Sequence, residues 1–507
     1  MVSIDGGPIR VEAVVAVARH GEPVQLGDGV EQRMSTAREA VERLDAAGEV
    51  AYGVTTGFGA LADRAVAPAD RSSLQRAVVL SHAAGMGGRL DDEVVRGMLL
   101  LRMRTLAGGL SGVRHELPAA IADLLNSGVV PWVPRHGSLG ASGDLAPLAH
   151  AACVLMGEGW VADGPGRVPA VSALHARGLE PIRIGPKEGL ALINGTDSSA
   201  ALMALAVHDV AALLQAADCA CAMSAEALLG TVRAYAEDVI ALRPAPGQAD
   251  SAANLRALLA ESPMVASHRE SHHAVQDAYS IRCAPQVHGA ARDLLGFARE
   301  TVTRELASFV DNPVVLDGEV VSTGNFHAQA LAYAADQVAS LCADIAAVSE
   351  RRLDRLLDPA RSRGLPAFLS PEPGLNSGFM IAQYTAAAMV ATLRQHAAPY
   401  AVQSASTSAG QEDHVSMAHE AGLRTRESVA MLRDVLAVEI TCAAQALELR
   451  APLRPAAGTS ALLRAVRERV PPLREDRMLH GDLEAVAAWL GEGGCAGAAE
   501  AAVGPLR

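Results

Sequence analysis

The segment GSLGASGDLAPLAH at residues 137–150 places three small residues, Ala141, Ser142 and Gly143, directly before an aspartate. Small side chains restrict the backbone little. Gly143 can adopt angles that are closed to other residues, and its amide can approach neighbouring atoms closely. The tripeptide can therefore fold back on itself. Taken alone, such a run usually forms a loop before a helix, with Asp144 near the helix N-terminus.

A glycine-rich segment, YGVTTGFG at residues 52–59, carries Tyr52. Three glycines in eight residues predict a flexible loop rather than the interior of a helix or strand. A tyrosine on a loop that closes over a substrate is a candidate general acid or base. The alternative is an ordinary surface loop with a half-buried tyrosine.

Tyr279 and Arg282 lie three positions apart in VQDAYSIRCAPQV, residues 275–287. On a helical turn, two such side chains face the same way. The planar guanidinium of arginine suits a carboxylate, to which it donates two parallel hydrogen bonds. A structural salt bridge is the commoner fate of an arginine and is the alternative here.

Three further polar residues end or follow apolar segments. His82 lies at the end of a helix predicted over residues 74–84, where a histidine favours the helix dipole. Asn194 precedes a glycine after the apolar run GLALI, which is a turn signal. Glu412 lies in QEDHVSM, residues 411–417, and acidic clusters of this kind are commonly solvated faces.

The histidines of SHRESHH, residues 267–273, invite a metal hypothesis. They lack an ordered pattern of cysteine or carboxylate partners, and no zinc-type spacing is present. We therefore predict no metal site.

The elements that must position these residues are predicted to be helices. Apolar residues recur at helical spacing over residues 11–19, 32–44 and 93–106. From about residue 198 the pattern changes to long apolar helices, which predicts a bundle of roughly parallel and antiparallel helices. We expect these helices over residues 200–229, 328–357, 377–401 and 424–449. The Gly- and Ala-rich end, from about residue 491, is expected to be frayed.

The chain of 507 residues carries a formal net charge of -14. This acidic balance argues against nucleic acid or an anionic membrane as a partner. Half of the residues are hydrophobic and only 3% are aromatic. This apolar content exceeds what a lone soluble domain usually needs, and buried subunit interfaces would account for it. No uninterrupted apolar run predicts a membrane span.

Seven cysteines are scattered along the chain without a C-x-x-C pair. The odd number is typical of reduced thiols in a cytosolic protein. The first residues lack the basic and then apolar pattern of a signal segment. We therefore predict a cytoplasmic protein.

Taken together, these segments resemble the histidine and aromatic amino acid ammonia-lyases. The resemblance rests on GSLGASGDLAPLAH, YGVTTGFG, GLALINGT, VQDAYSIRCAPQV, GNFH at residues 324–327 and QEDHVSM. It implies that Ala141-Ser142-Gly143 matures autocatalytically. The Gly143 nitrogen attacks the Ala141 carbonyl carbon, water leaves, and loss of water from Ser142 gives an exocyclic methylene. The product, 4-methylidene-imidazol-5-one (MIO), needs no external cofactor.

The resemblance also implies roles for single residues. Tyr52 becomes the catalytic base, and Arg282 binds the substrate carboxylate. Residues expected beside the MIO ring and the substrate are Asn194, Gln276, Tyr279 and Phe326. His82 and Glu412 are expected to recognise the substrate side chain, because a carboxylate can accept a hydrogen bond from an imidazole N–H.

The fold implied by the resemblance is mainly α, with a long central helical bundle of the fumarase/aspartase-like superfamily. We expect an N-terminal MIO-bearing domain over residues 1–196 and a helical region over residues 197–507. Family members are homotetramers whose active sites are assembled from segments of three subunits. Isolated monomers are therefore expected to be inactive.

The expected reaction is the deamination of L-histidine to trans-urocanate and ammonia. One alternative is a tyrosine ammonia-lyase or aminomutase with the same MIO group, since His82 also suits a phenol hydroxyl. Others are a catalytically silent helical paralogue and a metal-dependent, fumarase-like lyase. One departure concerns QSASTSAG at residues 403–410, where histidine lyases tend to have Asp first and Pro fourth. It bears on the geometry around Glu412.

Overall fold

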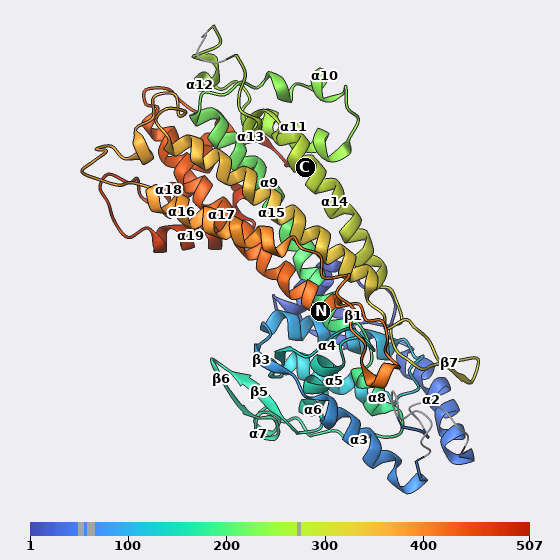
Figure 1. The fold of residues 1–507 in the computed structure, drawn as a ribbon. Coiled ribbons are helices and arrows are strands. Elements are labelled where there is room, and N and C mark those ends of the chain that lie inside the picture. The colour runs from blue at the N-terminus through green and yellow to red at the C-terminus, as the bar shows by residue number, and fades with distance from the viewer. Residues whose placement is uncertain (49–54, 58–65, 271–274) are drawn as a thin grey trace. The chain divides into compact units, whose positions relative to one another are not determined.

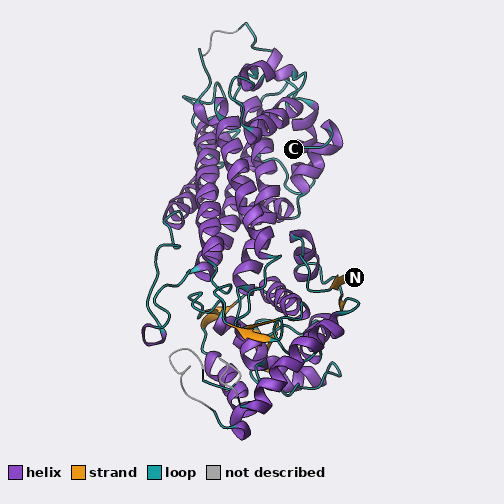
Figure 2. Cartoon of the chain, turned by 90° about the vertical axis from the view of Figure 1, so that its right-hand side faces the viewer, coloured by secondary structure: helices purple, strands orange, loops and turns teal. Residues whose placement is uncertain are grey.

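A computed structural model describes residues 1–48, 55–57, 66–270 and 275–507 of the chain. Helices dominate these residues, and the strands are few and short (Figure 2). The mainly α fold class is therefore confirmed. It follows from the abundance of alanine and leucine, which favour closely packed helices.

The described chain divides into two compact units. Unit 1 comprises residues 1–208, 299–336 and 399–424, and unit 2 comprises residues 209–298, 337–398 and 425–507. Unit 1 thus takes in two later segments that the sequence analysis assigned to the helical region. Four of the five boundaries fall within long helices, and the fifth, after residue 398, follows the end of a helix at His396. The expected division of the chain after residue 196 stays a prediction.

Unit 1 begins with helices that pack around α4 (Asp92–Ala107), which is buried along most of its length. Its apolar residues lie on all sides of the helix rather than on one stripe, as expected for a core helix. Neighbours of α4 are α1 (Val11–Ala18), α2 (Val30–Ala47), α5 (Glu116–Ser127) and α6 (Leu145–Leu155). The other short helices are α3 (Arg71–His82), α7 (Ala170–His175), α8 (Glu188–Ile193) and the 3-10 turn η2 (Pro68–Asp70).

Among the described residues, the strands form two-stranded sheets, and these lie within unit 1. β1 (Val2–Ile4) pairs with β2 (Val24–Leu26) in parallel, and the other pairs are antiparallel. These are β3 (Met86–Arg89) with β4 (Pro134–His136), β5 (Trp160–Asp163) with β6 (Gly166–Pro169), and β7 (Val314–Leu316) with β8 (Glu319–Val321). The pairing of Met86 with His136 brings the residues after α3 beside the start of the segment 137–144.

The long helices follow the predicted pattern. They are α9 (Asp197–Ala227), α14 (Ala284–Glu305), α15 (Gln329–Leu357), α16 (Met380–His396) and α17 (Ala418–Leu449). Figure 1 shows α9, α15 and α17 side by side. In unit 1, Gly422 of α17 faces the Leu202 side chain of α9. In unit 2, the Ser224 hydroxyl of α9 donates to Glu439 of α17.

Two of these helices, α9 and α15, are long and apolar enough in composition to cross a membrane. Most of the apolar stretch of each is buried inside the protein. Asp218 and Glu226 interrupt α9, and both are buried with hydrogen-bond partners. Such burial is typical of core helices.

Unit 2 also contains shorter helices: α10 (Glu237–Ile240), α11 (Pro246–Leu258), α12 (Pro263–Ala266), α13 (Tyr279–Arg282), α18 (Ala457–Arg467), α19 (His480–Gly491) and α20 (Gly494–Val503). The expectation that the chain frays from about residue 491 is wrong, because α20 is a regular helix. Cys495 and Ala499 of α20 are buried, and the helix packs against α18. Tertiary packing of small apolar side chains thus outweighs the weak helix propensity of glycine. Single 3-10 turns are η3 (Arg233–Tyr235), η4 (Ala367–Leu369) and η5 (Ser408–Gly410).

Candidate active site

The segment Gly137–Asp144 forms a loop between β4 and α6 in unit 1. Gly143 adopts a φ of 76° and pairs with Gly195 as a parallel bridge. A Cβ built on Gly143 would overlap the Gly195 carbonyl oxygen, so only glycine fits here. The Asp144 amide donates to the same carbonyl at 2.6 Å. The loop is therefore held backbone to backbone against the turn after α8.

Asp144 fixes the loop on its other side and is fully buried. Its carboxylate accepts hydrogen bonds from the hydroxyls of Ser138 at 2.8 Å and Ser199 at 2.9 Å. The amide of Ser199, in the first turn of α9, donates at 2.7 Å. A carboxylate also complements the positive end of a helix dipole. The expectation that Asp144 lies near the N-terminus of the following helix is confirmed, since it immediately precedes α6.

Ser142 contacts Asn194, as the resemblance suggested. The Ser142 hydroxyl donates to Asn194 Oδ1 at 2.6 Å, and Asn194 Nδ2 donates to the carbonyl of Asn312. These two partners fix which end of the Asn194 amide faces the serine. Arg102, itself buried, donates to the Asn194 carbonyl at 2.7 Å and pairs with Asp197 at 2.5 Å. Asn194 is thus held by both its side chain and its backbone.

The segment 411–417 lies against the same loop. The Met417 amide donates to the Leu139 carbonyl at 3.0 Å. Gly140 has a φ of 70°, and a Cβ on it would overlap the Ser416 hydroxyl. The predicted segments that carry Ser142 and Glu412 are therefore neighbours in unit 1.

Glu412 follows a tight turn. The backbones of Thr407 and Glu412 exchange two hydrogen bonds, at 2.9 and 3.3 Å. Between them, Ser408 and Ala409 adopt positive φ of 49° and 54°, a conformation that non-glycine residues rarely adopt. The Thr407 hydroxyl donates to Glu412 Oε2 at 2.8 Å. The carboxylate is half-buried and fixed in place, and it retains lone pairs for another donor.

The turn that contains Phe326 meets the same segment. The rings of His327 and His414 stack with centroids 5.6 Å apart and planes 4° apart. His327 Nε2 also lies 3.3 Å from the His414 carbonyl oxygen. Phe326, the residue before His327, is half-buried. The unusual QSASTSAG segment, within which Thr407 lies, thus supports Glu412 through a turn that contains no proline.

His82 is the last residue of α3. Its Nδ1 lies 2.7 Å from the Val78 carbonyl oxygen, which can only accept, so Nδ1 carries the proton. In the neutral ring, Nε2 is then a hydrogen-bond acceptor.

A second histidine, His150 of α6, holds the chain just after α3. The Gly85 amide donates to His150 Nε2 at 3.0 Å. Burial lowers the pKa of His150, which favours the neutral ring that can accept this hydrogen bond.

Gln276, Tyr279 and Arg282 belong to unit 2, where they line an open cavity of about 770 Å³. The Arg282 guanidinium lies 4.9 Å from the centroid of the Tyr279 ring. Arg282 Nε is buried without a hydrogen-bond partner among the described residues. Arg351 and Arg355 line the same cavity. Arg361 and Arg363 also line it, with the carboxylates of Asp277 and Asp354. Arginines thus outnumber carboxylates in the lining, which suits an anionic group such as a carboxylate.

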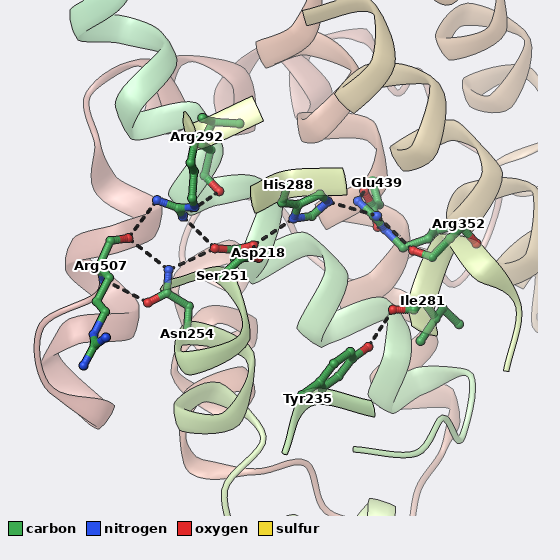
Figure 3. A network of polar contacts seen from close by, with 12 residues as sticks. Asp218, Tyr235, Ser251, Asn254, Ile281, His288, Arg292, Arg352, Glu439 and Arg507 are labelled. Carbon is green, nitrogen blue, oxygen red and sulfur yellow. Dashed lines mark hydrogen bonds and ion pairs between the residues drawn. The ribbon is translucent and has the colours of Figure 1, made fainter. Parts of the chain in front are cut away.

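The one-turn helix α13 that carries Tyr279 and Arg282 is anchored from behind by fully buried side chains (Figure 3). The Tyr235 hydroxyl donates to the Ile281 carbonyl at 2.8 Å, and Arg352 donates to the Ser280 carbonyl at 3.2 Å. The two anchored carbonyls, of Ser280 and Ile281, thus lie between Tyr279 and Arg282 in the sequence.

Arg352 is fixed in turn by a fully buried ion pair with Glu439, whose oxygens lie 2.6 and 2.9 Å from the guanidinium. His288 lies beyond it and pairs with buried Asp218 at 2.8 Å (Figure 3). Asp218 also accepts from Arg292 at 2.6 Å. Burial raises the pKa of Asp218, but the hydrogen bond with His288 and the Arg292 charge outweigh it, so the pKa is lowered.

Some sequence predictions fall outside these observations. Tyr52 lies outside the described residues, as do His272 and His273. His268 uses both ring nitrogens on the carbonyl oxygens of Met264 and Gly230. Within the described ranges, no group of histidine, cysteine and carboxylate side chains is arranged to hold a metal ion.

The sequence analysis missed the residues that support the site. Tyr235 and Arg352 give no local signal, because they lie 46 and 72 positions from the carbonyls they hold. Lys187 was also missed, although composition could have singled it out, since it is the single lysine of the chain.

Comparison with known proteins agrees with this geometry. The family described as "Aromatic amino acid lyase" matches residues 9–468. The histidine ammonia-lyase of Streptomyces avermitilis is 48% identical over 98% of each chain. The crystal structure of histidine ammonia-lyase from Trypanosoma cruzi superposes with a TM-score of 0.91 at 37% identity, covering 99% of this chain and 95% of that one. The tyrosine aminomutase structure from Streptomyces globisporus has a TM-score of 0.94 at 36% identity, with all of both chains covered. On these grounds, the chain belongs to the aromatic amino acid lyase family and is a carbon–nitrogen lyase.

Proposed function

We propose that this enzyme deaminates L-histidine to trans-urocanate and ammonia, using MIO formed from Ala141-Ser142-Gly143. Relatives named histidine ammonia-lyase that align with nearly the whole chain support the proposal. The single observation that carries the choice of substrate is the fixed carboxylate of Glu412 on a segment packed against the Ser142 loop.

The loop fits the group. Gly143 has the left-handed backbone and the absence of a side chain that close approach to Gly195 requires. Ser142 directs its hydroxyl to Asn194, which would then contact the mature ring. Once formed, MIO supplies an electrophilic methylene carbon, which no ordinary side chain provides.

Mass spectrometry of the peptide containing Ser142 tests the cofactor. The expected mass is that of the unmodified peptide less two waters, and the Ser142→Ala variant, as the control, keeps its full mass. A wild-type peptide of full mass would refute the proposed cofactor.

The other residues orient the substrate and move a proton. Arg282 binds the carboxylate, and its buried Nε, which has no hydrogen-bond partner in the described part of the chain, supports this assignment. Gln276 and Tyr279 line the same cavity. Tyr52 removes the β-proton, and Phe326 packs near the reacting group. Holding the substrate by its carboxylate orients the β-carbon before the reaction.

Glu412 and His82 recognise the imidazole. A carboxylate accepts from an imidazole N–H, which benzene does not offer. Because a hydrogen bond to a charged group contributes about 1.5–3 kcal/mol, Glu412→Gln should lower kcat/KM for L-histidine about 10- to 100-fold. Asp413→Asn, at the exposed neighbouring carboxylate, is the matched control and should leave it unchanged. Equal values in all three proteins would refute the assignment of Glu412.

A tyrosine ammonia-lyase or aminomutase is the second candidate. The observation that favours it is the match to the tyrosine aminomutase structure over the whole of both chains. His82 Nε2 would then accept from the phenol hydroxyl. An aminomutase keeps the amino group, so L-tyrosine would be consumed without release of ammonia.

We also propose a cytoplasmic homotetramer whose active sites combine segments of three subunits. Unit 2 supports this proposal with exposed apolar side chains near and on α16, with Leu375 81%, Ile381 60% and Tyr384 61% exposed. Such surface on a soluble protein commonly marks an interface. All seven cysteines are free, as expected in a reducing compartment. Light scattering during size-exclusion chromatography measures the assembly, and an active monomer would refute it.

A further inference from the structure

Lysine usage in this chain is extreme. Lysine and arginine number 43 together, and Lys187 is the only lysine. Its side chain is fully buried, and its backbone adopts a φ of 68°, which favours glycine. Lysine is almost never fully buried unless it is paired. The chain thus uses arginine for its other basic side chains and keeps its one lysine at a buried position.

The partner of Lys187 is Asp311. The ammonium lies 2.7 Å from Asp311 Oδ2, and both side chains are fully buried. An ammonium is a compact charge on a narrow stem, whereas the wider guanidinium of arginine needs room for a planar fork. Burial lowers the pKa of Lys187, and the Asp311 carboxylate opposes that shift.

From Asp311, hydrogen bonds lead to Ser142 in three steps. Asp311 Oδ1 accepts from the Asn312 amide at 2.7 Å. The Asn312 carbonyl accepts from Asn194 Nδ2, and Asn194 Oδ1 accepts from the Ser142 hydroxyl at 2.6 Å. Every donor in this series points towards Asp311. Reversing the Asn194 amide would face a carbonyl with another acceptor and so break the series.

The short helix α8 connects Lys187 directly to Asn194. Lys187 is the residue before α8, and Asn194 is the residue after it. Both are tied to the dipeptide Asp311–Asn312. This dipeptide is held further by Thr323, whose amide donates to Asn312 Oδ1 at 2.7 Å and whose hydroxyl donates to the Asp311 carbonyl at 3.1 Å.

We infer that Lys187 and Asp311 are positioning residues for maturation of the Ala141-Ser142-Gly143 loop, an inference that rests on the proposed MIO function. In maturation, the Gly143 nitrogen bonds to the Ala141 carbonyl carbon. That oxygen leaves as water with the amide hydrogens of Gly143 and Ser142. Ser142 then loses its α-hydrogen and its hydroxyl as the second water. Asn194 holds the hydroxyl that must leave, and the ion pair fixes the orientation of Asn194.

The test measures the mass of the Ser142 peptide in the full-length, assembled protein. Lys187→Met removes the charge and keeps the length, and Asp311→Asn keeps the shape of the partner. We expect the unreacted peptide to be the main species in both variants, while the wild-type peptide has lost two waters. Asp218→Asn is the matched control, because it weakens the interactions of an equally buried carboxylate, with His288 and Arg292, in unit 2. In this control, the dehydrated peptide should remain the main species, even if the melting temperature falls as far as in Lys187→Met or Asp311→Asn.

The outcomes separate two failures. Complete dehydration in folded Lys187→Met or Asp311→Asn would overturn the positioning role alone. Equal loss of dehydration in Asp218→Asn would also overturn it, because a general loss of stability would then explain the effect. If Lys187→Met does not fold, the milder Asp311→Asn variant decides. An unreacted wild-type peptide would refute the proposed cofactor, and this inference with it.

Discussion

The helix that carries Arg282 offers a sharp test of how the protein binds a carboxylate. Tyr235→Phe removes one hydroxyl, which donates to the Ile281 carbonyl at 2.8 Å. Both Tyr235 and Ile281 are buried, so water does not replace the lost donor. A buried carbonyl left without its donor costs about 1–3 kcal/mol. The Ser280 carbonyl keeps its bond from Arg352, so α13 should shift rather than unfold.

The expected effect is on substrate binding. One or two kcal/mol corresponds to a factor of about 5–30 in an equilibrium constant. KM for the amino acid should therefore rise about 5- to 30-fold in Tyr235→Phe. The turnover number should change less, since the proposed contact of Arg282 with the carboxylate would be the same in the ground state and the transition state.

Steady-state kinetics of deamination measures both quantities. Histamine, which has the imidazole and the amine but lacks the carboxylate, serves as a competitive inhibitor, and its inhibition constant should not change. Tyr333→Phe, at a half-exposed tyrosine on α15, is the control. An unchanged KM in Tyr235→Phe would contradict the reasoning, and so would a parallel rise in the inhibition constant for histamine.

Two further predictions concern thiols and pH. Burial raises the pKa of Cys153 to about 11 and that of Cys221 to about 12. Iodoacetamide near pH 8 should therefore label half-exposed Cys283 well before Cys153 or Cys221, and bound L-histidine should slow the labelling of Cys283. The masses of the cysteine peptides, followed over time, measure these rates. Equal labelling rates for the three cysteines would contradict the prediction. Burial also raises the pKa of Asp197 from 3.8 to about 6. Between these values the folded protein binds the proton more tightly than the unfolded chain, so this residue's contribution to stability falls as pH rises. Urea unfolding at several pH values across that window should show a weaker pH dependence in Asp197→Asn than in the wild type; identical slopes would contradict the shift.

The helices were predictable because burial imposes a period on the sequence. The expected helix over residues 328–357 matches α15 (Gln329–Leu357) almost to the residue. The C-terminal segment was mispredicted, because glycine and alanine give little periodic signal and the burial of Cys495 arises from packing against other helices. Local patterns thus locate an element where one of its faces is clearly apolar.

In the candidate site, too, some features have a local sequence signal and others arise only from the folded chain. The resemblance implied Asn194 beside the MIO ring, and in the structure the Ser142 hydroxyl donates to Asn194 Oδ1 at 2.6 Å. The role of Asn194 in the reaction stays a prediction. The support behind them was not predictable from local patterns. Lys187 and Asp311 lie 124 positions apart, so only the folded chain reveals their pairing. The role of Tyr52 stays a prediction, since that residue lies outside the described structure.

The central claim is that Glu412 makes this enzyme a histidine ammonia-lyase. The most direct measurement incubates the purified protein with L-histidine, L-tyrosine and L-phenylalanine in turn and follows the ultraviolet absorbance of the conjugated product. We predict a rise with L-histidine alone, from trans-urocanate. A rise with L-tyrosine and none with L-histidine would contradict the claim and assign His82 to a phenol hydroxyl instead.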